Sequence, residues 1–214
     1  MSDIGGIAGF AADLMEWLGA PGAGLAVALE NIFPPIPSEV ILPLAGFTAS
    51  VGDMNLAAAL ICTTLGSIVG ALALYGIGQA FGRDRLYAVV ARIPLVKVTD
   101  VEKTEAWFAK HGTKAVFFGR FIPIFRSLIS IPAGLERMPL RIFLTLTALG
   151  SAIWNTLFIM LGYGLGSRWE TVSDVVGTYS KVVLVAAVLV VVVFVVVRVV
   201  QLRRRQRAGL SEEP

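Results

Sequence analysis

The segment Phe33-Pro34-Pro35-Ile36-Pro37-Ser38-Glu39-Val40-Ile41-Leu42-Pro43-Leu44-Ala45-Gly46 recurs 88 positions later as Phe121-Ile122-Pro123-Ile124-Phe125-Arg126-Ser127-Leu128-Ile129-Ser130-Ile131-Pro132-Ala133-Gly134. Aligned without a gap, the two segments share the phenylalanine, one proline, two isoleucines and the closing Ala-Gly. At the same offset, Tyr75-Gly76-Ile77-Gly78 aligns with Tyr163-Gly164-Leu165-Gly166. The pattern predicts an internal duplication that covers each segment and the apolar helix after it.

Both copies of the segment are too apolar for a surface loop, yet their prolines remove backbone donors and prevent one continuous helix. In a membrane, this combination predicts a helical hairpin that enters the bilayer and returns to the same side. We expect Pro35, Pro37 and Pro123 to lie at the hairpin tips.

The composition is that of an integral membrane protein, because 56% of the 214 residues are hydrophobic and only 15% are charged. The single cysteine, Cys62, excludes an internal disulfide and argues against a cysteine-ligated metal. We expect no cofactor. The formal charge of +3 is small, and nucleic acid is not an expected partner.

We predict an all-α integral membrane protein whose residues 1–214 form a single membrane domain. Segment lengths and apolar faces distinguish spanning helices from helices that lie on the membrane surface. In chain order, the predicted segments are an interfacial helix (1–20), a re-entrant hairpin (21–50), a transmembrane helix (54–80), a cytoplasmic amphipathic segment (81–113), a second re-entrant hairpin (114–137), two transmembrane helices (140–166 and 180–202) and a cytoplasmic tail (203–214).

The basic residues predict the orientation of these segments. Thirteen lysines and arginines flank the spans on one side, whereas only Arg168 and Lys181 flank them on the other. Cytoplasmic loops retain Lys and Arg, so the C-terminus and the open end of the second hairpin are expected in the cytoplasm. The first hairpin then opens to the outside. This is an inverted repeat, each copy preceded by an amphipathic interfacial helix, as in secondary transporters.

Four charges lie in the hairpin regions: Glu30 and Glu39 in the first copy, Arg120 and Arg126 in the second. A charge at lipid depth costs about 2.5 to 3.5 kcal/mol on insertion scales, so these residues require partners or water. One interpretation is that they only fasten the hairpins together, although buried ion pairs are poor stabilisers compared with apolar packing. The other is that Arg120 and Arg126 bind an anionic headgroup while Glu30 and Glu39 bind protons and gate transport.

The segments Glu30 to Glu39 and Phe118 to Arg126, with the later Ala133-Gly134, resemble the two signature segments of the DedA family, also called the SNARE-associated or VTT domain family. The resemblance covers roughly Trp17 to Gly166. It implies a multi-pass lipid transporter, or flippase, of the bacterial cytoplasmic membrane with paired re-entrant hairpins. It also implies undecaprenyl phosphate or a phospholipid such as phosphatidylethanolamine as the substrate, and it assigns functional roles to the four charged residues.

Three other functions remain alternatives. An enzyme acting on lipid phosphates would need a nucleophile or a metal site, and the only histidine, His111, lies in a basic stretch. A proton-coupled transporter of small ions or drugs would use the carboxylates as proton relays. A structural adaptor would need none of the four charges. The sequence leaves open the lipid, the direction of transport, the coupling ion and whether the chain forms a homo-oligomer.

Overall fold

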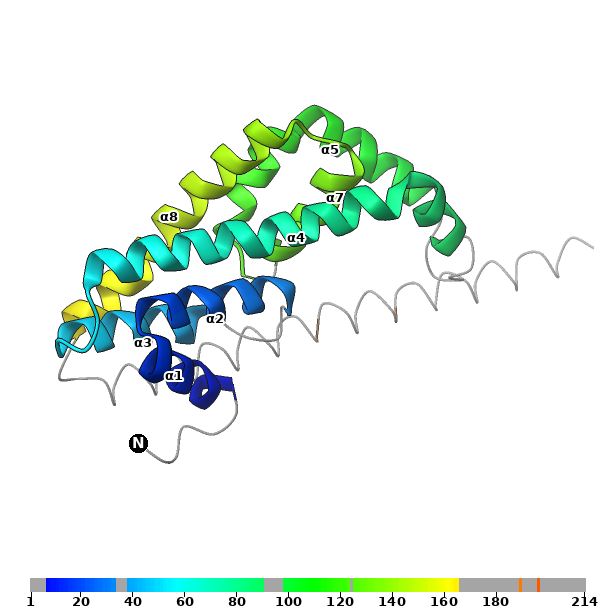
Figure 1. Cartoon of the computed structure of the whole chain (residues 1–214). Helices are drawn as coiled ribbons and strands as arrows, with labels where there is room; N and C mark the ends of the chain where they lie inside the picture. Colours follow the sequence, from blue (N-terminus) through cyan, green and yellow to red (C-terminus); the bar gives the residue numbers. More distant parts are fainter. Residues whose placement is uncertain are drawn as a thin grey trace, which may run out of the picture.

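The computed structural model describes residues 7–33, 38–90, 98–123 and 125–165, with the isolated positions 189 and 196. All of the elements in these ranges are helices, which confirms the predicted all-α class (Figure 1). They are α1 (Ile7–Leu18), α2 (Ala20–Ile32), α3 (Ser38–Ser50), α4 (Leu56–Val90), α5 (Val98–Gly119), α6 (Phe125–Leu128), α7 (Ser130–Leu135) and α8 (Leu140–Leu165). The predicted tips Pro35 and Pro37 lie outside the described residues, as do the tail 203–214 and nearly all of the predicted helix 180–202.

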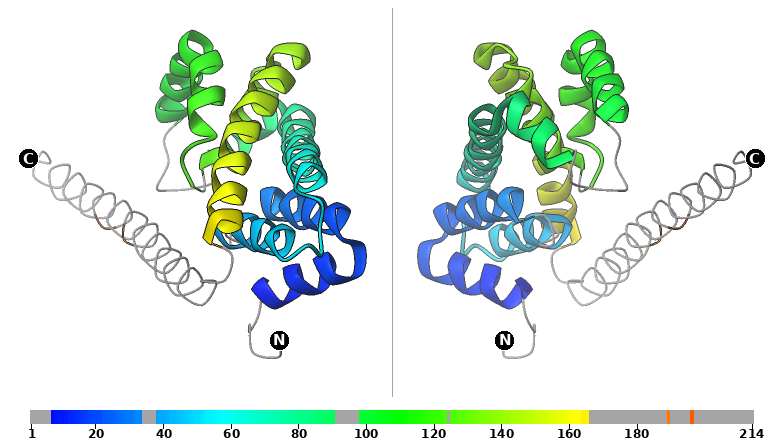
Figure 2. Two further views of the ribbon diagram at one scale, coloured as in Figure 1. Left: turned by 90° about the vertical axis from the view of Figure 1, so that its left-hand side faces the viewer. Right: turned by 90° about the vertical axis from the view of Figure 1, so that its right-hand side faces the viewer.

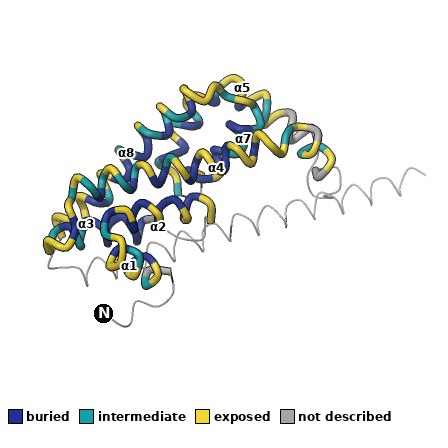
Figure 3. The backbone as a smooth tube through the Cα atoms, viewed as in Figure 1, coloured by how far each residue is buried: buried dark blue, intermediate teal, exposed yellow. Residues whose placement is uncertain are grey.

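Two of the helices are long and apolar enough to cross a bilayer. They are Leu56–Arg83 within α4 and Leu140–Leu165, which is α8, with mean hydropathies of 2.0 and 1.7. Only 33% and 39% of their most apolar windows are buried inside the protein. Exposed positions therefore recur along both helices (Figure 3). Large apolar residues occupy many of them: Ile61, Leu65, Val69, Leu72 and Ile77 on α4, and Leu149, Ile153, Leu157, Met160 and Leu161 on α8. Such surfaces are stable against lipid, so both helices suit the predicted spans.

The shorter helices pack against α4 and α8 in a crossed pattern. Helix α2 packs along α4, whereas its sequence neighbour α3 packs on α8. In the second half, α5 packs on α8, whereas α7 returns to α4. Helix α1 covers α2 and α3, and α1 and α5 lie at opposite ends of the molecule (Figure 2). Each half therefore contributes one arm to the other half's long helix.

Three helix boundaries differ from the predicted ones. Helix α2 begins at Ala20, within the predicted interfacial segment 1–20, because Pro21 is tolerated in its first turn. Helix α5 runs without a break through the predicted boundary between residues 113 and 114, and Gly112 there packs beneath the ring of Phe108. Helix α4 continues past residue 80 and kinks at Gly82, whose φ of 69° is left-handed.

Glycines make equivalent helix–helix contacts at two places, between α3 and α8 and between α7 and α4. A Cβ at Gly46 in α3 would lie 2.0 Å from the carbonyl oxygen of Ile159, and one at Gly134 in α7 would lie 2.0 Å from that of Tyr75. In return, Gly162 of α8 meets the carbonyl of Pro43, and Gly78 of α4 meets that of Ile131. These contacts need glycine because two helix backbones touch there.

The equivalent contacts correct the predicted register of the duplication. Gly46 and Gly134 are 88 positions apart, but their partners Ile159 and Tyr75 are only 84 apart. Gly78 and Gly162 are also 84 apart. The offset of 88 therefore holds for the hairpin segments, whereas the long helices correspond at 84. Four additional residues follow the first hairpin, so Tyr75 is not the counterpart of Tyr163.

We expect Gly46→Ala and Gly134→Ala each to lower the free energy of unfolding by about 1 to 3 kcal/mol, because an added methyl group would overlap a backbone carbonyl. The apparent Tm of the purified protein in detergent measures this loss. Gly76→Ala is the matched control, because no heavy atom lies within 4 Å of a Cβ there. The packing is contradicted if Gly134→Ala melts at the same temperature as Gly76→Ala.

Candidate functional site

A buried ion pair joins the two halves of the chain. The carboxylate of Glu30, near the end of α2, accepts a hydrogen bond from Nη2 of Arg126 in α6. Both side chains are almost fully buried. Beside this pair, the hydroxyl of Ser127 donates to Oδ1 of Asn31 at 3.2 Å. Two consecutive residues of α2 thus contact two consecutive residues of α6, which fixes the register between the two hairpin regions.

Arg120 is also buried, with 2% of its surface exposed, but it contacts no carboxylate of a residue that the structure describes. Its Nη1 donates to the backbone carbonyl of Arg126 at 2.7 Å. Its Nη2 donates to the hydroxyls of Ser130 (3.1 Å) and Thr147 (2.9 Å). The guanidinium also lies 5.8 Å from the ring centre of Phe143, a cation–π distance.

These contacts tie the turn of the second hairpin region to α8. The turn follows the end of α5 and includes Pro123, whose carbonyl accepts a hydrogen bond from the amide of Phe125 at 2.7 Å. Helix α6 begins directly after it, and Arg120 holds the backbone of α6 at Arg126. Of the two predicted arginines, Arg120 is therefore committed to neutral groups, and only its Nε, which is buried, lacks a hydrogen-bond partner.

Glu39 lies at the start of α3 and is 6% exposed. It makes no hydrogen bond or ion pair with any residue that the structure describes, but it lies close enough to Glu30 for the two carboxylates to repel each other. Pro43 follows four residues later inside α3, so the backbone carbonyl of Glu39 also lacks its usual helical donor. Acceptors that cannot be satisfied locally favour a position next to water or a polar ligand.

The four predicted residues therefore form one electrostatic cluster with three kinds of environment. Glu30 and Arg126 are paired, Arg120 is held by neutral groups, and Glu39 forms no ion pair with any residue that the structure describes. Within the described residues, no group of three or more His, Cys, Asp and Glu side chains could hold a metal ion. Among the described residues, the carboxylate of Glu30 is the one charged partner of Arg126.

The sequence pattern did not identify the uncharged polar residues that contact the cluster. Asn31, Ser127, Ser130 and Thr147 are all buried. Polar residues inside apolar helices need partners, and that signal was present for each of them. It could not identify the partner, because Thr147 is 27 positions from Arg120 and Asn31 is 96 positions from Ser127.

The chain matches one family model and is similar to several bacterial proteins. The family model of the VTT domain matches residues 36–164. The chain is 43% identical to a protein of Lactococcus lactis named alkaline phosphatase-like protein, over 80% of this chain and 82% of that one. It is 37% identical to undecaprenyl phosphate transporter A of Bacillus subtilis, over 83% and 88% of the two chains. Protein DedA of Escherichia coli is 30% identical over 64% and 62%. No solved structure gives a significant match.

The geometry predicts different stabilities for two isosteric substitutions. Glu30→Gln leaves the buried Arg126 without its counter-charge, so we expect it to lower the free energy of unfolding by about 3 to 5 kcal/mol. Glu39→Gln removes a carboxylate that has no cationic partner, so its effect should be small or stabilising. Thermal unfolding of both purified variants measures the difference, and equal losses would contradict the assigned pairing.

Proposed function

The chain belongs to the DedA family of VTT domain proteins, and from this membership we propose that it moves a lipid with an anionic phosphate headgroup across the bacterial cytoplasmic membrane. One observation supports the proposal most strongly. Arg126 is buried between the two hairpin regions, and its partner Glu30 is itself an anion of the kind that a phosphate can replace. Guanidinium groups bind phosphate with two parallel hydrogen bonds, which a single carboxylate contact does not exploit.

In the proposed cycle, the empty carrier keeps Glu30 on Arg126. The arriving phosphate displaces the carboxylate and takes the guanidinium. Arg120 serves as a positioning residue, because it fixes the backbone of Arg126 and the turn that presents it. Ser127 and Asn31 keep the neighbouring residues in register while the exchange occurs.

The displaced carboxylate provides a link to protons. Once Glu30 loses Arg126, it is buried near Glu39 and forms no ion pair with any other described residue. Two carboxylates close together in a low-dielectric site do not both remain ionised, so one of them takes a proton. Lipid binding and protonation are then coupled, and the proton gradient can drive the movement of the lipid.

We further propose that the two hairpin regions are re-entrant and inverted with respect to each other. The crossed packing of α3 on α8 and α7 on α4, with its repeated glycine contacts, supports two structurally equivalent halves. The distribution of basic residues favours a cytoplasmic location for the loop after α7 and for the C-terminus. The mouth of the first hairpin then faces outside.

Undecaprenyl phosphate is the substrate we propose, because two relatives bear that lipid in their names at 36% and 37% identity. A phosphatidylethanolamine flippase or scramblase, or a proton-coupled carrier of small ions or drugs, is the alternative. The name alkaline phosphatase-like protein suggests an enzyme instead. An enzyme would release inorganic phosphate from the lipid, whereas a transporter returns it unchanged.

Replacing Arg126 by lysine should reduce undecaprenyl phosphate transport at least about tenfold, because the ammonium retains the charge but not the bidentate fork. Purified protein in liposomes is assayed for transbilayer movement of undecaprenyl phosphate and phosphatidylethanolamine in parallel, with released phosphate measured in the same samples. Arg141→Lys is the control, because Arg141 is exposed at the start of α8. Transport at the parent rate in Arg126→Lys would remove the argument for phosphate recognition.

The orientation predicts which residues are accessible from each side. In a Cys62→Ser background, a cysteine at position 50 should react with an impermeant thiol reagent added outside, and a cysteine at position 137 only with reagent in the cytoplasm. Position 50 ends α3 and position 137 follows α7. Labelling of both positions from one side would show that the hairpins are not inverted.

The proton link predicts a change in pH dependence. Glu39→Gln cannot accept a proton, so we expect transport by this variant to vary less with pH than transport by the parent, while lipid binding persists. The same assay on Glu30→Gln tests the other carboxylate. If both variants fold and keep the parent pH profile, proton linkage is excluded and the carboxylates only fasten the hairpins.

A further inference from the structure

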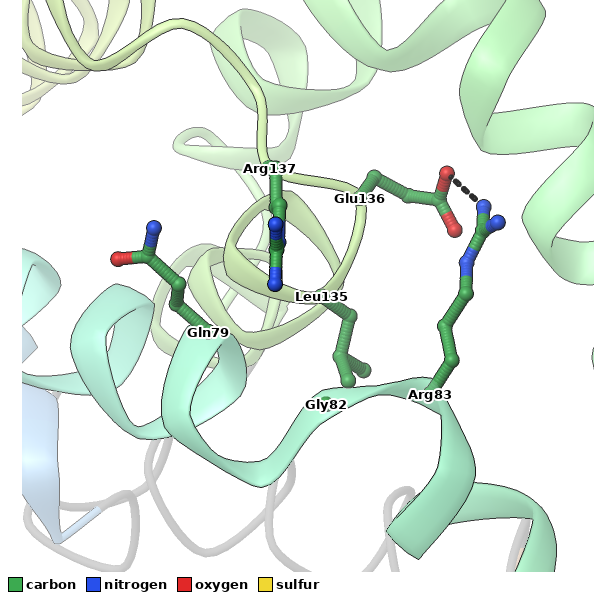
Figure 4. Close-up of a pocket in the computed structure, with 6 residues that line it drawn as sticks. All are labelled: Gln79, Gly82, Arg83, Leu135, Glu136 and Arg137. Carbon is green, nitrogen blue, oxygen red and sulfur yellow. Dashed lines mark hydrogen bonds and ion pairs between the residues drawn. The ribbon is translucent and has the colours of Figure 1, made fainter.

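A pocket with polar and charged lining residues lies beside the kink of α4 at Gly82, separate from the buried cluster. It encloses about 380 Å³ and is lined by residues of α4 and of the segment that ends α7: Gln79, Gly82, Arg83, Leu135, Glu136 and Arg137. This volume is within the range of small-ligand sites. Figure 4 shows Arg137 reaching from the segment after α7 toward α4, between Gln79 and the Arg83–Glu136 pair.

The two arginines of the pocket differ in how their charge is balanced. Arg83 donates to Glu136 at 2.6 Å and lies 3.5 Å from Glu105, so two carboxylates neutralise it. Arg137 is exposed and forms no ion pair with any residue in the described part of the chain. The pocket therefore presents a guanidinium that forms no ion pair among the described residues, together with the amide of Gln79, and both groups can donate hydrogen bonds to a phosphate.

The backbone at Arg137 has a conformation that does not favour arginine. Its φ is 50°, a left-handed conformation, and it is the sole residue other than glycine with positive φ among the described positions. Its amide donates to the carbonyl of Gly134, and the amide of Met138 donates to that of Ala133. This pair of hydrogen bonds is a Schellman motif, whose left-handed position glycine occupies at the lowest cost.

Helix α3 ends in the same motif and shows the usual choice of residue. The amide of Gly52 donates to Ala49 and the amide of Asp53 donates to Thr48, with Gly52 at the left-handed position. The two hairpin regions thus end in the same backbone structure, with glycine in one and arginine in the other. Arginine gives no advantage to this backbone conformation, so its value lies in the guanidinium.

We propose that the pocket around Arg137 is a second anion site, which binds the phosphate of a lipid headgroup, or free phosphate, at the membrane surface. In the orientation proposed above, this surface is cytoplasmic, and the inference rests on the proposed function for the identity of the lipid. The site holds the headgroup where it enters or leaves the buried cluster. A second pocket lies at the end of α3, where Glu16 and Asp53 line it. No basic residue is among its described lining residues, so it does not offer a site for an anionic headgroup.

The test uses the full-length protein in mild detergent, with farnesyl phosphate, inorganic phosphate and farnesol as probes. Binding to the folded state raises the apparent Tm, so the half-saturating concentration of each probe can be measured. Parallel measurements in an Arg126→Lys background isolate this pocket from the buried cluster.

Arg137→Gly should raise the half-saturating concentration of farnesyl phosphate about tenfold, because it removes a charge-assisted hydrogen bond. Its Tm without ligand should be unchanged or higher, because glycine suits the left-handed backbone. Arg137→Asn, which also tolerates this conformation, provides the same comparison if the glycine variant does not fold. Arg141→Gln removes the same charge outside the pocket and should leave binding unchanged.

The proposed site is wrong if both phosphate probes bind Arg137→Gly and Arg137→Asn as tightly as they bind the parent protein. It is also wrong if Arg141→Gln weakens binding of the probes as much as the Arg137 variants do. Dependence on Arg137 for farnesyl phosphate alone assigns a lipid headgroup, whereas equal dependence for inorganic phosphate assigns free phosphate. The proposed function fails separately: Arg126→Lys would then transport normally, while binding of the phosphate probes would still depend on Arg137.

Discussion

The structure depends on the pairing of Glu30 with Arg126, two charges that are both removed from solvent. An unpaired charge in such an environment costs several kcal/mol, so the pair holds α2 and α6 together as long as neither residue has another partner. Attraction of this kind is strong but replaceable. In the proposed cycle, a second anion takes the guanidinium and a proton neutralises the freed carboxylate, so the same contact would hold the protein together and respond to a ligand.

Close backbone packing supplies the rigid frame around this exchangeable contact. Gly46 and Gly134 bring α3 and α7 against the long helix of the opposite half at carbonyl distance. Contacts between backbones tolerate sliding poorly, because an ångström of displacement brings a neighbouring Cβ into the gap. We infer that α3 moves with α8 and that α7 moves with α4.

The features that depend on apolar length, proline and charge could be predicted from the sequence. Apolar length predicted α4 and α8, and prolines among apolar residues predicted the breaks at the hairpins. The cluster was predictable because isolated charges in apolar segments need one another. The alignment between the two long helices was harder to predict. The sequence match aligns Tyr75 with Tyr163, but the backbone contacts show that Tyr75 and Ile159 hold equivalent places in the two halves. The matching segments Leu65-Gly66-Ser67 and Leu149-Gly150-Ser151 have the same offset of 84. The role of Arg120 depends on hydroxyl groups from α7 and α8, which no local pattern identifies.

Equivalent halves raise the question of what gives transport a direction. Two halves with the same backbone contacts would treat both membrane faces alike, so a directional bias has to come from side chains that differ between them. The pocket at the end of α3 is lined by Glu16 and Asp53, whereas the pocket after α7 is lined by Arg137 and Gln79. In the proposed cycle, an anionic headgroup would be repelled at the first pocket and attracted at the second. This difference lies outside the buried ion pair, so it would bias the occupancy of each membrane face without altering the pairing of Glu30 with Arg126.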